Sequence, residues 1–182
     1  MSEWFDVVDR TGRPTGEIVE REEAHLKGIW HRTAHLWLVR EKNGKIQILL
    51  QKRSQTKDSH PGCYDISSAG HIPAGVDYRP SAIRELNEEL GINADENELI
   101  FCADRTVISD AYFHGKPFHD RQCSRVFIMW RDLSEDAFKI SLDEVESVVW
   151  MDFEECLNGV KNNLFQNCIS IDELEILRKA IY

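Results

Sequence analysis

Apolar residues gather in several short stretches of the chain, separated by polar turns, as expected for strands that are buried on one or both faces. These stretches lie at Arg32–Arg40, Lys45–Arg53, Leu99–Ser109, Ser124–Arg131 and Val145–Met151. Asn43 and Gly44 separate the first two and predict a hairpin, because Asn-Gly favours a tight turn with positive φ. Residues 6–20 read as two shorter strands around a Gly/Pro turn. We expect them to form a β-hairpin extension within residues 1–28.

Helical spacing replaces the strand pattern in three segments. An apolar stripe runs along Ser81–Leu90, formed by Ala82, Ile83, Leu86 and Leu90. Pro80 suits the first turn of this helix and Gly91 suits its C-terminal cap. Later helices are predicted at Asp152–Val160 and Ile171–Ile181, and the second of these forms the C-terminal helix of residues 170–182. Strands first, a helix in the middle, more strands and then helices predict a mixed α/β sandwich rather than regular βαβ winding.

Composition narrows the class of protein without identifying it. A length of 182 residues predicts one domain over residues 1–182. We expect a soluble, cytoplasmic protein, because no apolar run is long enough for a membrane span and the acidic start does not resemble a signal peptide. The net charge of −10 argues against binding of nucleic acid polymers or membranes. It leaves small phosphorylated ligands open, because bound metal ions can reverse the local potential.

The helix at Ser81–Leu90 carries the candidate chemistry. Glu85, Glu88 and Glu89 are three and four residues apart, so their carboxylates share one helix face. Arg84 lies four residues before Glu88 and can orient or partly neutralise it. Clustered carboxylates repel each other unless cations gather them, and Mg²⁺ prefers oxygen ligands and bridges to phosphates. A solvated surface helix has the same pattern, but the glycine-containing turn SAGHIPAG before this helix favours a metal site.

This region resembles the Nudix hydrolases, whose signature is G-x5-E-x7-R-E-U-x-E-E-x-G-U, with U an aliphatic residue. The matching positions are Gly70, Arg84, Glu85, Leu86, Glu88, Glu89, Gly91 and Ile92. Val76 stands where the signature has its first glutamate. The similarity extends over roughly Trp4–Trp150, through HRTAHLWLV, LLQKRS and KDSHPGCYDISSAGH, and points to the branch that includes isopentenyl-diphosphate isomerases.

The resemblance implies a Nudix-type α/β/α sandwich with a mixed sheet and attack of water on a diphosphate linkage. It implies that Glu85, Glu88, Glu89 and the carbonyl of Ala69 hold Mg²⁺ or Mn²⁺. Glu85, Glu88 and Arg84 are the candidate catalytic residues. One of the glutamates, or a nearby acid, would act as general base, and Arg84 would hold the carboxylates in place. The implied substrate is a small metabolite in which a nucleoside diphosphate is linked to a group X.

Further candidates for contact with the substrate phosphates are Gln51 and Arg53, at the end of a predicted strand, and Arg32. An exposed strand terminus is an equally good reading of the first two. The sequence does not define the oligomeric state.

Two acidic positions of the family pattern are altered. Val76 cannot bind a metal or accept a proton, although Asp77 could replace the missing acid if the turn is shifted by one residue. Gln122 is neutral where related enzymes commonly have a glutamate. Its role could pass to another acid, and the candidates are Asp120, Asp143, Glu144 and Glu146.

Three histidines raise a second possibility. His25, His31 and His71 correspond loosely to the imidazole ligands of a metal in the isopentenyl-diphosphate isomerases, and together they predict a possible second metal site. Those enzymes also need a cysteine immediately before the turn glycine, where this chain has Ala69. Hydrolysis is therefore favoured. An isomerase-like enzyme and a non-catalytic Nudix ligand-binding module remain as alternatives.

Overall fold

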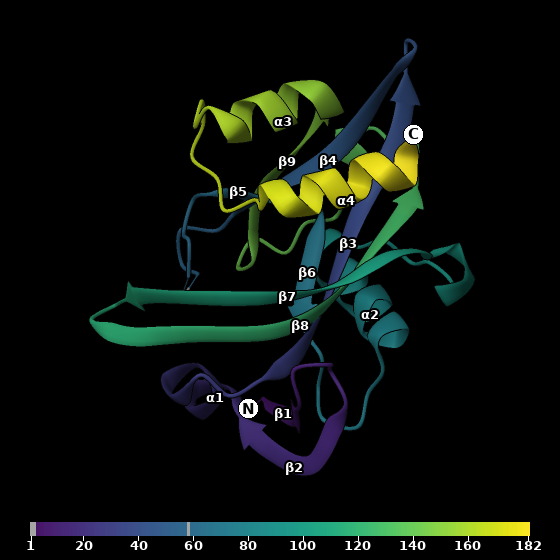
Figure 1. Cartoon of the computed structure of the whole chain (residues 1–182). Coiled ribbons are helices and arrows are strands. Elements are labelled where there is room, and N and C mark those ends of the chain that lie inside the picture. The colour runs from purple at the N-terminus through teal and green to yellow at the C-terminus, as the bar shows by residue number, and fades with distance from the viewer. Residues whose placement is uncertain (1–2, 58) are drawn as a thin grey trace.

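The computed structural model describes residues 3–57 and 59–182, and a seven-stranded mixed sheet forms its centre (Figure 1). The strands are β3 (His31–Lys42), β4 (Lys45–Arg53), β5 (Tyr64–Asp65), β6 (Ser68–His71), β7 (Ile100–Phe113), β8 (Lys116–Trp130) and β9 (Val145–Asp152). Five of them follow the order β5-β4-β3-β8-β7, while β6 pairs with β3 and β9 pairs with β4. The sheet is mixed because β3 runs parallel to β8 and antiparallel to β4 and β6.

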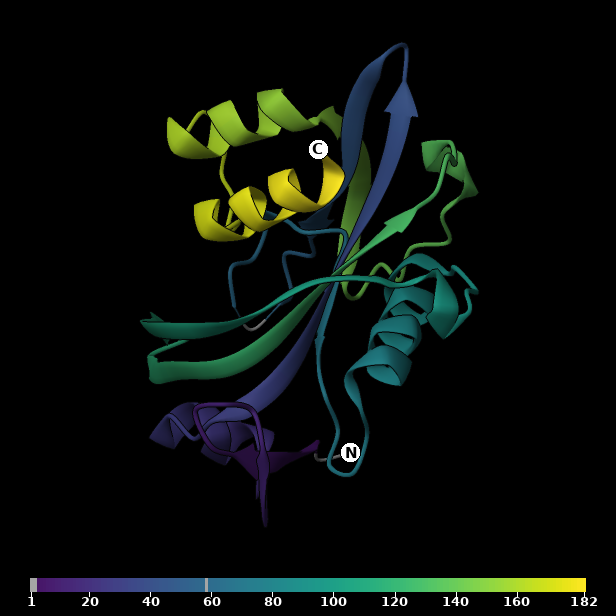
Figure 2. The ribbon, with the colours of Figure 1, turned by 45° about the vertical axis from the view of Figure 1, so that its right-hand side comes forward.

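Helices cover both faces of the sheet, as Figures 1 and 2 show. Successive residues of a strand point to opposite faces, and β3 shows this clearly. Leu36 packs in one cluster with residues of α2 (Tyr78–Leu90), whereas Trp37 packs in another with residues of α3 (Phe153–Lys161) and α4 (Ile171–Ile181). The predicted α/β/α sandwich with a mixed sheet is therefore confirmed.

The N-terminal extension lies at the opposite end of the molecule from α3 and α4 (Figure 1). It contains the hairpin β1 (Trp4–Val8) and β2 (Pro14–Glu20), followed by α1 (Arg21–Lys27). The hairpin was expected, but α1 was not, because seven residues are too short for a clear helical period. Phe5, Val19 and Ala24 form a small core within the extension.

The main differences from the predicted elements lie in β7 and β8. Both extend beyond the predicted Leu99–Ser109 and Ser124–Arg131, and they form a long hairpin that turns at His114 and Gly115, both with positive φ. The added half of β8 is rich in polar residues because it borders a cavity rather than the apolar core. The described residues contain no helix with the length and apolar character of a membrane span.

Candidate active site

A cavity of about 650 Å³ lies between the sheet and the elements around it. Its lining comes from β3, β6, β7 and β8, from α2, from the start of α4 and from the loop after β4. Segments that are far apart in the sequence therefore meet at one polar cavity.

The three glutamates of α2 line this cavity together with Ala69. Arg84 donates hydrogen bonds to Glu88 Oε2 at 2.6 Å and to Glu85 Oε1 at 2.5 Å. It thus holds two of the carboxylates. The backbone N–H of Ala69 donates to Glu89 Oε2 at 3.3 Å, and this hydrogen bond joins the turn before α2 to the third carboxylate. The helical spacing and the glycine turn therefore bring together the residues implied as metal ligands.

Gly70 explains how Glu85 reaches the turn. A Cβ atom added at Gly70 would overlap the Glu85 carboxyl group. The first glycine of the sequence motif is thus required by close approach of a side chain rather than by an unusual backbone angle.

Burial sets the electrostatics of the cluster. It raises the pKa of Glu85 to about 7, against the opposing effect of Arg84, and it raises the pKa of Glu89 to about 8. Glu88 is more open, with 55% of its side chain exposed. Glu89 is buried, Glu85 is mostly buried and Glu88 lies at the solvent side. Their carboxylates are oxygen donors of the kind that a hard divalent cation binds, and such a cation would offset the cost of ionising the two less exposed groups.

The structure gives Val76 and Asp77 other roles. Val76 packs against the core on the α2 side of the sheet. Asp77 is the N-cap of α2, and its carboxylate accepts a hydrogen bond from the N–H of Tyr78 at 2.7 Å. Neither residue belongs to the described lining of the cavity. Asp77 therefore does not bring a carboxylate to the position that Val76 leaves without one.

The acids considered as replacements for Gln122 are separated in space. Asp120 and Glu144 line the cavity, and Glu144 is paired with Lys57. Glu146 pairs with Lys52 at 2.6 Å outside the described lining, which also does not include Asp143.

The three candidate substrate contacts are also separated. Arg53 lines the cavity and donates to Asp65 Oδ2 at 3.1 Å. Gln51 is buried within β4, and Arg32 is buried between Asp6 and the carbonyl of Val76, at 2.7 and 2.8 Å. Neither Gln51 nor Arg32 is among the described residues that line the cavity. Arg32 instead connects the N-terminal extension to the turn before α2.

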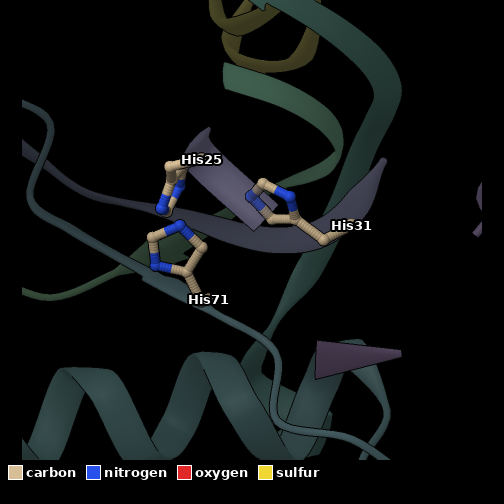
Figure 3. A group of neighbouring side chains, drawn as sticks. All are labelled: His25, His31 and His71. Carbon is tan, nitrogen blue, oxygen red and sulfur yellow. The ribbon is translucent and has the colours of Figure 1, made fainter. Parts of the chain in front are cut away.

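His25, His31 and His71 converge from α1, β3 and β6 (Figure 3). One ring nitrogen of each lies within 4.8 Å of the others. His31 Nδ1 donates to the carbonyl of Ile29 at 2.8 Å, which leaves Nε2 with a lone pair. The Nε2 atoms of all three histidines are buried and lack a hydrogen-bond partner.

Asp120 adds a carboxylate to this cluster, whereas the sequence suggested it only as a replacement for the acid missing at Gln122. Its Oδ1 atom is also buried without a partner, 3.6 Å from His31 Nε2 and 3.9 Å from His25 Nε2. Burial lowers the pKa of His25 to about 3 and that of His31 to about 4, and it raises the pKa of Asp120 to about 6. The histidines are thus neutral imidazoles near neutral pH, the form that binds metals, and the unpartnered atoms fit a cation.

An α/β/α sandwich, with an acidic helix behind a glycine turn at a polar cavity, has the architecture and residue pattern of a Nudix hydrolase. Comparison with known proteins agrees. The model of the NUDIX domain matches residues 29–167, and the chain belongs to the Nudix family.

Relatives support the same assignment. The chain is 35% identical over 162 residues to an uncharacterized Nudix hydrolase of Clostridium acetobutylicum, covering 89% of this chain and 76% of that protein. It is 40% identical over 159 residues to Nudix hydrolase 3 of Arabidopsis thaliana, covering 86% of this chain and 20% of that longer protein. The chain is therefore a Nudix hydrolase, a pyrophosphohydrolase by class.

Solved structures share the fold at low sequence identity. The DR0079 protein of Deinococcus radiodurans matches with a TM-score of 0.68 at 17% identity, covering 97% of this chain and 98% of that one. The NUDIX domain of Shewanella oneidensis NrtR, solved with ADP ribose, matches with a TM-score of 0.61 at 13% identity, covering 83% of this chain and 88% of that one.

Proposed function

We propose that this protein hydrolyses a diphosphate linkage in a small metabolite of the nucleoside diphosphate–X type and requires Mg²⁺ or Mn²⁺. The observation that carries the proposal is the convergence of Glu85, Glu88, Glu89 and Ala69 at one polar cavity, with Arg84 bound to two of the carboxylates. Such a donor set suits a hard divalent cation that also binds phosphate oxygens.

The residues of this site have different proposed roles in metal binding, positioning and proton transfer. The three glutamates and the Ala69 carbonyl would hold the cation, which when bound supplies charge neutralisation of the diphosphate and a more acidic water. Arg84 fixes the carboxylates before substrate arrives. Either Glu85 or Glu88 accepts a proton from the water that attacks phosphorus, while the bridging P–O bond breaks. Two phosphate monoesters leave, one of them a nucleoside monophosphate.

The test is a substrate screen with each metal. ADP-ribose, UDP-glucose, dinucleoside polyphosphates, nucleoside triphosphates and prenyl diphosphates are incubated with Mg²⁺ or Mn²⁺, and phosphate-containing products are measured. Glu88→Gln combined with Glu89→Gln is expected to lower kcat at least a hundredfold, whereas Glu154→Gln on the exposed side of α3 leaves it unchanged. No turnover of any compound, or unchanged turnover in the double variant, contradicts the proposed mechanism.

The two alternatives predict other results from the same screen. An isomerase-like enzyme would convert isopentenyl diphosphate to its allylic isomer, and we expect none because Ala69 offers no thiol. A binding module, suggested by Val76 and Gln122, would bind a nucleotide in the presence of metal without converting it.

We also propose that His25, His31 and His71, with Asp120, hold a transition-metal cation such as Zn²⁺. The support is the burial of four unpartnered ligand atoms in one cluster. Zn²⁺ at about a hundred times its Kd is expected to add roughly 2.7 kcal/mol to the stability of the folded state. His71→Gln should abolish the resulting rise in Tm. His119→Gln, at a more exposed position in β8, should retain it. An equal rise in both variants would show that Zn²⁺ binds elsewhere.

A further inference from the structure

A buried carboxylate at the start of α4 organises a second group of polar side chains. Glu173 is 2% exposed. It accepts hydrogen bonds from His35 Nδ1 at 2.9 Å, from Trp37 Nε1 at 2.9 Å and from Arg105. A buried charge is costly unless it is paired and hydrogen-bonded, and these three donors satisfy both carboxylate oxygens.

Two of these donors face the cavity. His35, Arg105 and Glu173 all belong to its lining, together with Ser170, whose hydroxyl accepts a hydrogen bond from Arg105 Nη2 at 3.0 Å. Among the described residues, His35 Nε2 has a hydrogen-bond contact with Thr33 Oγ1 at 3.4 Å, which is long for a hydrogen bond. The imidazole edge opposite Glu173 therefore has little to bind within the protein.

This group lies on the α4 side of the sheet, but it lines the same cavity as the carboxylates of α2. His35 on β3 lies directly opposite Ala69 on β6, and side chains in such positions are about 5 Å apart on the same face of a sheet. Ala69 in turn carries the carbonyl expected at the metal and donates its N–H to Glu89. A substrate whose diphosphate lies against the carboxylates would thus extend its remaining part over His35 and Arg105.

We propose that His35 and Arg105 form a second subsite, which binds an oxygen-rich group of the substrate beyond the metal-bound diphosphate, and that Glu173 is the residue that positions them. The inference rests on the proposed function and deepens it. A guanidinium can only donate, and His35 can donate or accept at Nε2. The ligand group therefore presents oxygen acceptors, from either a further phosphate or sugar hydroxyls.

Equilibrium binding in the presence of Mg²⁺ tests the subsite. The probes are inorganic diphosphate, which reaches only the carboxylates, and ADP-ribose, UDP-glucose and diadenosine tetraphosphate, which extend beyond them. Where a probe is converted, KM replaces Kd. Arg105→Gln, His35→Gln and Glu173→Gln are compared with Asp172→Asn, a matched change at the neighbouring, exposed position of α4.

The expected result is a loss of at least about tenfold in affinity for the extended probe that the wild type binds best. Affinity for inorganic diphosphate should change less than twofold, as should every affinity in Asp172→Asn. A loss confined to diadenosine tetraphosphate assigns the subsite to phosphate oxygens, and a loss with the two sugar compounds assigns it to hydroxyls.

Three outcomes would overturn the subsite. The wild type could bind no extended probe more tightly than inorganic diphosphate, the variants could weaken both kinds of probe equally, or they could leave both unchanged while lowering Tm. The last result would show that the group only anchors α4. If Glu173→Gln does not fold, Arg105→Gln and His35→Gln decide the matter. Binding without turnover would contradict the proposed hydrolysis and retain the subsite.

Discussion

Gly70 and Glu85 show how one missing side chain shapes the candidate site. The Glu85 carboxyl occupies the space that a Cβ atom at Gly70 would need. Arg84 donates a hydrogen bond to the same carboxyl. The position of a proposed metal ligand is therefore controlled by a residue that carries no functional group.

Gly70→Ala is accordingly expected to displace Glu85 and to lower kcat/KM about a hundredfold, because small misplacements of catalytic groups have effects of this size. Steady-state kinetics on the substrate found in the screen measure the effect. Gly115→Asn, in the turn between β7 and β8, adds a side chain into open space and should leave kcat/KM within twofold. Equal activity of Gly70→Ala and the wild type would mean that Glu85 is not needed where the structure places it.

Single residues also show the limit of sequence reasoning. The glutamates of α2 could be placed together because one helix carries them at a known period. Asp120 could not be placed beside the histidines, since that cluster depends on how α1, β3, β6 and β8 meet in space. Arg32 was expected at the substrate, but the sequence does not reveal that Asp6 binds it.

At the level of elements, α2 begins earlier than its apolar stripe predicts. The helix starts at Tyr78 rather than Ser81 because Asp77 supplies the N-cap. This observation separates two roles of Asp77, since asparagine keeps the cap but cannot replace a carboxylate.

Asp77→Asn is expected to change both kcat and the free energy of unfolding very little, whereas Asp77→Ala should lower the free energy of unfolding by about 1 kcal/mol. Activity assays and urea denaturation measure the two quantities. A large loss of kcat in Asp77→Asn would show that Asp77 does act in place of the glutamate missing at Val76.

The contact between α4 and β3 gives the protein a defined dependence on pH. Burial is the largest single effect and alone would lower the pKa of His35 and raise that of Glu173. The attraction and hydrogen bonds between the two groups, joined for Glu173 by Arg105 and Trp37, together outweigh burial. The pKa of His35 is raised above its ordinary value of 6.5, and that of Glu173 falls from 4.5 to about 2. Stability from Glu173 is thus lost as pH falls from about 4.5 towards 2, and stability from His35 is lost as pH rises above 6.5.

Glu173→Gln should therefore destabilise the protein most between about pH 4.5 and pH 6.5, by roughly 3 kcal/mol, since it leaves buried cations without their partner. Urea denaturation of both proteins from pH 3 to about pH 9 measures the difference. A difference that is constant across this range would mean that the two groups are not linked as the structure indicates.

Most helices and strands could be predicted from the sequence, because the period of apolar residues reflects which side of an element is buried. The bounds of α4 were predicted correctly, and those of β4 as well. The first half of β8 was not predicted, since its polar residues Asp120 and Gln122 line the cavity and so break the alternation expected of a strand packed on a core. The end of β7 was not predicted either, and there the cavity is lined by Ala111 and Phe113.

At the scale of the whole molecule, the N-terminal extension is joined to the site by a buried ion pair. Arg32 Nη2 donates to Asp6 Oδ2 at 2.7 Å, and the same carboxylate oxygen accepts from the N–H of Gly75 at 3.0 Å. Asp6 thereby links β1 to β3 and to the turn that leads into α2. The extension also brings His25 to the histidine cluster. We therefore propose that the chain behaves as one domain, in which the extension and the sandwich unfold together.

Asp6→Ala tests whether the extension and the sandwich unfold together. The change leaves the buried guanidinium of Arg32 without its carboxylate, so we expect the free energy of unfolding to fall by about 3 kcal/mol. Because Gly75 also loses its acceptor, the turn before α2 should loosen and kcat/KM should fall as well. Glu17→Ala, at an exposed position of β2 in the same hairpin, should change neither quantity.

A single cooperative transition in both variants, monitored by tryptophan fluorescence and by circular dichroism, is expected if the chain is one domain. Two separate transitions, or a loss of stability in Asp6→Ala without any change in activity, would instead indicate that the extension folds and acts independently of the site.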